Sequence, residues 1–226
     1  THRHTGGSIS ILQAYVDHYD RRDPLLGEKR RTLDIEYQNQ MAVASGHLWN
    51  WGLGFRASQD VVPATLYLAL DPARRQLSWV HAFFQDEISL AEGRVAVTLG
   101  AKTEYTELSG LELQPSAQLL WEVAPDHTFW ASISRAARTP NRGEQDAAIW
   151  MDTVPGVPES FHLPAVLRYV GDPSYGSQHL FAVEAGWRHQ PHPRISLDLA
   201  AFRNRYDRLR FAELGLPQVQ ILPTPH

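Results

Sequence analysis

Histidine is the residue type in this sequence that first suggests chemistry, because 11 histidines occur among 226 residues. His2 and His4 are two residues apart, and His189 and His192 flank a short Gln-Pro segment typical of a turn. A metal site needs several donor atoms that converge on one ion and further groups that orient them. Neither pair has such donors arranged around it, so we expect solvated turn residues, no metal site and no cofactor.

Carboxylates and hydroxyl groups could support hydrolysis, but they lack a catalytic context in this sequence. The chain has no cysteine and no Gly-x-Ser-x-Gly segment, which removes thiolate and serine-elbow nucleophiles. Asp86, Glu87 and Glu112 lie in segments where charge facing a water-filled interior is expected anyway. We therefore predict that the chain is not an enzyme.

The elements that carry these residues alternate apolar and polar side chains. In the segment Arg94–Tyr105, Val97 and Leu99 lie on one face of an extended chain, and Lys102 and Glu104 lie on the other. Repeated segments of about ten residues with this pattern are typical of an outer-membrane barrel, which meets lipid outside and water inside. We predict an all-β fold: an antiparallel transmembrane β-barrel segment of nine or ten strands.

Nine strands can be placed along the chain with this pattern. They are Ser8–Tyr19, Arg30–Gln40, His47–Ser58, Leu77–Ile88, Arg94–Leu108, Leu111–Val123, Thr128–Ala137, Leu180–Arg188 and Arg194–Asp207. A weaker tenth strand is expected to begin near Leu209. The charges expected to face the interior are Asp34, Glu36, Lys102, Glu104, Glu112, Glu122, Glu184, Arg188 and Asp198.

The connections between these strands fall into two alternating classes. Short ones carry Gly, Pro, Asp or Ser, as tight hairpin turns do: Met41–Gly46, Ser89–Gly93, Ala124–His127 and Gln190–Pro193. Long irregular ones are Asp20–Lys29, Gln59–Gln76 and Arg138–His179, where we expect one ordered piece at Val166–Val170. Outer-membrane barrels have short periplasmic turns and long extracellular loops. This asymmetry therefore predicts that Ala124–His127 faces the periplasm and that Arg138–His179 lies outside the cell. The tight turn Ser109-Gly110 is an exception on the outer rim.

Composition narrows the partners. The formal net charge is −4 and the pI is about 6.2, with no Lys/Arg-rich run, so nucleic acid is not an expected partner. No stretch reaches the roughly 20 apolar residues that a membrane-spanning helix needs. A bilayer could therefore be crossed only by closed strands, with outer-membrane lipid as a partner.

Three pairs of segments carry motifs more specific than alternation. They are Phe83–Glu87 (F-F-Q-D-E) with Val95–Lys102 (V-A-V-T-L-G-A-K), Gln114–Ala117 (Q-P-S-A) with Ser134–Pro140 (S-R-A-A-R-T-P), and Glu184–Arg188 (E-A-G-W-R) with Ile195–Phe202 (I-S-L-D-L-A-A-F). In order and spacing these hairpins resemble the TonB-dependent receptors, the large outer-membrane barrels that import metal chelates, vitamin B12 and some sugars.

The resemblance implies what the chain belongs to and does. Residues 1–226 would be part of a barrel of about 22 strands in the Gram-negative outer membrane. The chain starts at Thr1 without a signal peptide, and we expect the family's plug domain and TonB box to lie outside it. The implied partners are the TonB complex, reached through that plug, and a small ligand such as a ferric chelate.

The outer loops are where such a ligand would first be met. The candidate contacts are Arg138, Arg142, Tyr169, Tyr175 and His179. Arginines would suit an anionic iron chelate because they form bidentate, charge-assisted hydrogen bonds. Ordinary loop chemistry stays open for each of them.

Two other classes of protein stay open at this point. A passive porin or an autotransporter barrel would share the strand pattern and lack the plug. A soluble β-sandwich or lipocalin-like binding module would have to bury its apolar face against a second sheet.

Overall fold

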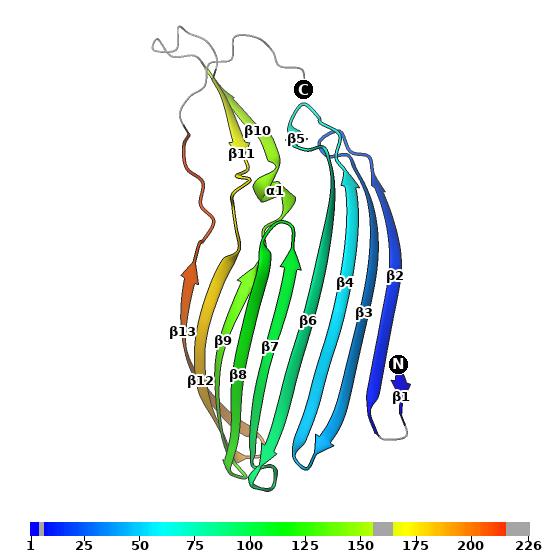
Figure 1. Cartoon of the computed structure of the whole chain (residues 1–226). Helices are drawn as coiled ribbons and strands as arrows, with labels where there is room; N and C mark the ends of the chain where they lie inside the picture. The colour runs from blue at the N-terminus through cyan, green and yellow to red at the C-terminus, as the bar shows by residue number, and fades with distance from the viewer. Residues whose placement is uncertain (5–6, 156–164, 216–226) are drawn as a thin grey trace.

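One curved antiparallel sheet forms the wall of the protein (Figure 1). The computed structural model describes residues 1–4, 7–155 and 165–215. The sheet has 10 strands in the order β1-β2-β3-β4-β6-β7-β8-β9-β12-β13. Their bounds are β1 His2–Arg3, β2 Ile9–Arg21, β3 Glu28–Ala44, β4 His47–Val61, β6 Arg74–Leu90, β7 Val95–Thr106, β8 Gly110–Ala124, β9 His127–Arg138, β12 Gln178–His192 and β13 Ile195–Asp207.

All nine predicted strands are confirmed, with ends that shift by a few residues. Their order in the sheet is their order in the sequence, because each strand pairs with the strands of this sheet that precede and follow it in the chain. The turn between β3 and β4 shows how tight the connections are at the end of the sheet that carries the short turns. Gly46 adopts φ 80°, and a Cβ there would lie 2.6 Å from the carbonyl oxygen of Ser89, so glycine is required at that position.

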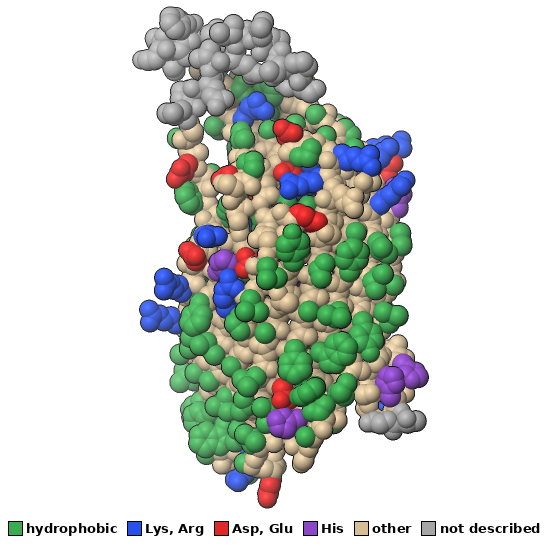
Figure 2. All heavy atoms as spheres, in the orientation of Figure 1, with side chains coloured by type: hydrophobic (Ala, Val, Ile, Leu, Met, Phe, Trp, Pro, Cys, Tyr) green, Lys and Arg blue, Asp and Glu red, His purple; other side chains and the backbone are tan. Residues whose placement is uncertain are grey.

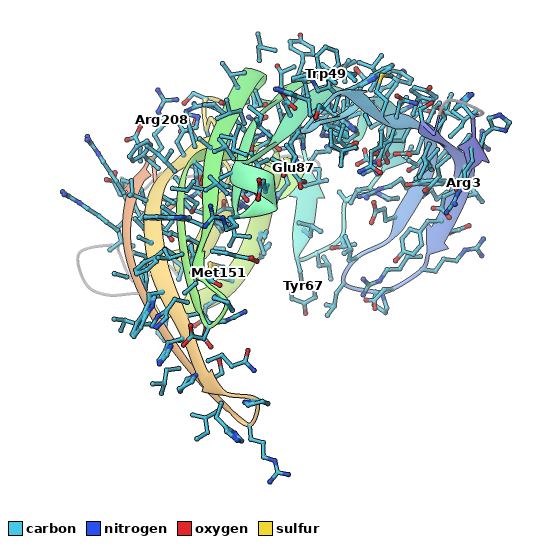
Figure 3. All side chains as sticks on the ribbon, turned by 90° about the horizontal axis from the view of Figure 1, so that it is seen from below. Arg3, Trp49, Tyr67, Glu87, Met151 and Arg208 are labelled. Atoms are coloured by element: carbon cyan, nitrogen blue, oxygen red, sulfur yellow. The ribbon has the colours of Figure 1, made fainter. Side chains whose placement is uncertain are left out.

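The two faces of the sheet differ as the alternation predicts. Figure 3 shows the sheet as an open arc, with Trp49 on its convex side and Tyr67 toward the hollow. Apolar side chains cover the convex face in a broad band (Figure 2) and stay exposed: Leu53 is 55% and Leu199 is 68% accessible. Among the described residues the buried apolar set is small: Val62, Leu77, Leu108, Ala147 and Ala182. So small a core and so large an exposed apolar face fit the predicted wall whose convex side faces lipid.

The concave face carries the predicted interior charges. The strand register places Asp34 opposite Arg56, and the Arg56 Nε atom donates to Asp34 at 2.7 Å. Arg188 and Asp198 pair in the same way at 2.6 Å. Aromatic rings on this face lie over glycines, as Trp130 does over Gly186.

Asp86 corrects one expectation, because it lies on the convex face and not toward the interior. Successive strand residues face opposite sides, so Asp86 and Glu87 cannot both point inward. Asp86 lies opposite Trp49 in the register, and its carboxylate is 2.8 Å from His47 Nδ1. The two carboxylates therefore cannot act together on one substrate.

The long loops form structure of their own at one end of the wall. A small sheet has the order β11-β10-β5, with β5 at Leu68–Leu70, β10 at Ala147–Val154 and β11 at Ala165–Val170, next to the one-turn helix α1 at Arg142–Gln145. The ordered piece Val166–Val170 is thus confirmed as β11. Arg138–His179 is not one irregular loop, since it also holds α1 and β10; its residues 156–164 lie outside the described part.

The predicted tenth strand near Leu209 is wrong for the described residues, because no strand is present in 208–215. The tenth strand of the sheet is the short β1 at the other edge. No described helix has the length and hydropathy to span a membrane.

Candidate ligand-binding site

Helix α1 is the centre of the predicted loop site. Asn141 caps it: the Asn141 side chain accepts from the Glu144 N–H at 3.1 Å, and the Asn141 N–H donates to the Glu144 carboxylate at 3.0 Å. This reciprocal capping box directly follows Pro140, two residues after the end of β9. The local sequence thus places one helical turn at the mouth of the wall.

Arg142 fastens α1 to the wall. Its guanidinium donates to Asp60 on β4, to the carbonyl of Pro72, and to Asp146 at 2.8 Å. Asp146 is also held by Arg75 on β6 at 2.5 Å. Arg142 is 8% exposed, so this arginine is used within the protein. Its predicted contact with a ligand stays a prediction.

Three other candidate residues meet α1 or its contacts. Arg138 donates to Glu144 at 2.8 Å, and the carbonyl of Tyr175 accepts from Gln145 Nε2 at 2.7 Å. The guanidinium of Arg210 lies 5.4 Å from the centroid of the Tyr169 ring, and Arg210 Nη1 is 3.6 Å from the Glu144 carboxylate. The structure therefore brings four of the five predicted residues to one cluster, and their roles toward a ligand stay predictions.

His179 lies apart, at a gap between β8 and β9. The ladder of these strands ends where Ser116 lies opposite Ser134, although both strands continue. Pro115, the residue before Ser116 on β8, has no N–H with which to continue the ladder.

Side chains close this gap in place of backbone hydrogen bonds. Glu112 is buried there and accepts from His179 Nε2 at 3.0 Å and from Arg135 Nη2 at 3.3 Å. Arg135 also donates to the carbonyl of Leu113. His179 thus helps to seal the wall, and its ligand contact stays a prediction.

The concave face below α1 is hollowed. Two adjoining hollows, of about 500 Å³ and about 620 Å³, share Glu28, Arg30, Ser58 and Trp79. We call them together the inner groove. Its further polar and aromatic lining includes Tyr15, Tyr19 and Arg56.

Two arginines of the inner groove keep free hydrogen-bonding capacity. Arg30 pairs with Glu28 at 2.5 Å and its side chain is 48% exposed. Arg56 pairs with Asp34 and its side chain is 51% exposed. A guanidinium has five N–H donors, so donors stay available beside each carboxylate. Together with the aromatic rings, they can hold an anionic, aromatic-rich ligand.

Sequence reasoning missed the inner groove and the contacts through which Arg142 holds α1 to the wall. Arg30 and Arg56 fall on the polar parity of predicted strands, so their face could be read, but not their common hollow. The signal for α1 was present as Asn141 followed three residues later by Glu144.

One group of possible metal donors comes together among the described residues, at the short-turn rim: Asp126, His127 and His189. The two imidazole rings are stacked, with centroids 4.0 Å apart and planes 13° from parallel. Lone pairs in parallel ring planes do not converge on one ion. The Nδ1 atom of His127 also accepts from Trp187 Nε1 at 3.1 Å, which leaves the His127 proton on Nε2. The geometry therefore fits a hydrogen-bonded stack better than metal ligation.

Solved siderophore receptors share this fold. The receptor PirA from Pseudomonas aeruginosa matches with a TM-score of 0.67 and 17% identity over 89% of this chain and 36% of its own. A mutant of the ferric enterobactin receptor PfeA from the same organism, in complex with enterobactin, matches with a TM-score of 0.66 and 17% identity, over 90% and 33%. PirA from Acinetobacter baumannii gives a TM-score of 0.61 and 14% identity, over 80% and 27%.

These likenesses show the fold, and the chain spans 27% to 36% of the lengths of these three structures. No curated protein matches it. The family described as TonB dependent receptor-like, beta-barrel, matches residues 2–219. With its one-sided apolar wall and its strand order, the chain belongs to the TonB-dependent receptor family, as a part of the β-barrel.

Proposed function

We propose that the chain is part of the barrel wall of a receptor that imports a scarce small ligand across the Gram-negative outer membrane. The observation that carries the proposal is the sheet with an uncovered apolar convex face and a charged concave face that contains the inner groove. The apolar face would lie in lipid, and the short turns would face the periplasm. The family match supports the transport class.

The wall contributes capture and guidance to this import. A ligand would enter past α1 and the small sheet and meet the inner groove, where Arg30 and Arg56 present N–H donors beside Tyr15, Tyr19 and Trp79. Energy coupling would come from the TonB complex acting on a plug domain. Those parts are not among residues 1–226.

An anionic ferric chelate is the ligand class that suits these groups. Arginines bind such oxygen-rich anions through charge-assisted hydrogen bonds, and aromatic rings pack on flat ligand surfaces. One solved structure with this fold holds enterobactin. Ferric enterobactin is therefore the first probe to use.

The test is ferric enterobactin binding and uptake by cells that express the full-length protein. We expect the double variant Arg30→Gln, Arg56→Gln to weaken binding about tenfold or more, since each lost charge-assisted bond contributes roughly 1.5–3 kcal/mol. The matched control is Arg31→Gln with Arg94→Gln, which removes the same charge from outside the inner groove.

Dependence on TonB separates the proposal from its main rival. Deletion of TonB should abolish uptake and leave binding intact. Uptake that persists without TonB would favour a passive porin or an autotransporter-type barrel. A soluble binding module is the third class, and a monodisperse monomer in buffer without detergent would support it.

A further inference from the structure

Two arginines of β13 break the apolar pattern of the convex face. Arg203 lies opposite Val183 in the register, and Arg205 lies opposite Phe181. Phe181 in turn lies opposite Arg135 on β9. These five residues share the face of Leu199 and Trp187, which the same register pairs. We call them the outer arginine patch.

The patch is charged on a face that should meet hydrocarbon. Charged side chains on the lipid face of a barrel are costly, most of all near the midplane. Arg135 is partly satisfied by Glu112, but within 165–215 and the other described ranges neither Arg203 nor Arg205 has an ion-pair partner. Asp207 follows on the same face, opposite His179. Among the described residues the patch therefore has a net positive charge, on the edge strand of the sheet.

The position of the arginines along β13 allows their charged groups to reach the headgroup layer of the proposed membrane. The first half of β13 presents Leu197, Leu199 and Ala201 on the convex face, and the arginines follow toward the strand end that carries the long loops. From Leu197 to Arg203 the strand rises about 20 Å, at about 3.3 Å per residue. Long arginine side chains can reach further along the wall to the headgroup layer. Figure 2 shows basic side chains gathered at the left edge of the apolar face, where Figure 1 draws β13.

The geometry points to a binding site for the phosphate groups of a phosphorylated glycolipid in the outer leaflet, with its acyl chains against Phe181 and Val183. This inference rests on the proposed membrane orientation. The planar guanidinium matches phosphate in a bidentate way that a single amine cannot, and two arginines two residues apart on one strand can bind one headgroup together. Charge complementarity and the adjoining apolar band both fit this lipid class.

The test places the full-length protein in phosphatidylcholine nanodiscs with bis-phosphorylated lipid A or with the same lipid A after dephosphorylation. Native mass spectrometry measures the lipid retained, and thermal unfolding measures stabilisation. We expect phosphorylated lipid A to be retained about tenfold better, and Arg203→Gln with Arg205→Gln to remove that preference. The matched control is Arg188→Gln with Arg194→Gln, which removes two arginines from the same hairpin but from the concave face and the short turn.

A conservative variant protects the test from misfolding. Arg203→Lys with Arg205→Lys keeps the charge, so it should retain a weaker preference for the phosphorylated lipid. The inference fails if wild-type protein retains both lipids equally, if inorganic phosphate alone stabilises it as much, or if the Gln variant keeps the preference. It also fails if the arginines prove to pair with carboxylates of the full-length protein outside residues 1–226. Protein that inserts and transports without phosphate preference would overturn this inference alone, and protein that does not insert would overturn the proposed function.

Discussion

On the concave face, the Trp130 ring packs directly on Gly186 and leaves no room for a larger side chain there. A Cβ on Gly186 would lie 2.4 Å from two atoms of the Trp130 indole ring. Gly186→Ala should therefore force the ring to move and cost about 1–3 kcal/mol, as overpacking does. The measurement is urea unfolding of the full-length protein in lipid vesicles.

A double-mutant cycle shows whether the ring is the cause. In a Trp130→Ala background, Gly186→Ala should cost much less, because the obstructing ring is gone. Equal costs in both backgrounds would mean that the effect arises in the backbone and not from this contact.

Asp172 makes a pH-dependent turn between β11 and β12. Its carboxylate accepts from the Ser174 hydroxyl at 2.7 Å and from the Ser174 N–H at 2.8 Å, and these bonds hold the pKa of Asp172 below its usual value of 3.8. A lowered pKa means that the charged form stabilises the turn above pH 3.8 and that this contribution is lost as pH falls through the lowered value. Carbon-13 NMR titration of the carboxyl group should show a raised pKa in Ser174→Ala. A midpoint that does not move would contradict this account.

Helix α1 is the element that joins the long loops to the wall. Arg142→Met would leave Asp60 and Asp146 buried without their shared cation, a change that costs about 3–5 kcal/mol for a buried pair. We expect faster hydrogen exchange around α1, β5 and β10. Exchange in β2 and β3 should stay unchanged, because the wall pairs through its own backbone.

The matched control for this element is Arg22→Met. Arg22 also pairs with a carboxylate, Asp20, but its side chain is 83% exposed, and exposed pairs contribute little. Similar exchange in both variants would show that Arg142 does not hold α1 in place.

The strands could be predicted from the sequence, whereas the elements that depend on distant contacts could not. Period-two alternation is local, so β7 and β8 were placed to within a few residues. Strand β10 pairs with β5 through Ala147 and Leu70, which are far apart in the chain, and nothing local to either signals the other. In the candidate site, Arg142 was identified by type, but its burial follows from Asp60 on another element. The weak pattern near Leu209 forms no strand in residues 208–215, although one side of β13 is unpaired in the described structure.

At the scale of the whole molecule, the wall separates two environments. Trp51 lies on the convex face opposite Phe84, and Trp130 lies on the concave face over Gly186. Brominated phosphatidylcholine quenches tryptophan that touches acyl chains. We expect Trp51→Phe to reduce the quenchable share of the fluorescence and Trp130→Phe to leave the lipid-quenched intensity unchanged. The reverse result would mean that the two faces are assigned the wrong way round.

The uncovered convex face also determines how freely the two sides of the wall can drift in sequence. In the proposed membrane orientation its side chains adjoin fluid lipid, so exchanging one apolar side chain for another there opens no void. Gly186 beneath the Trp130 ring has no such freedom. A mutational scan should therefore find that the convex face tolerates any apolar residue, whereas the concave face tolerates only side chains of suitable size.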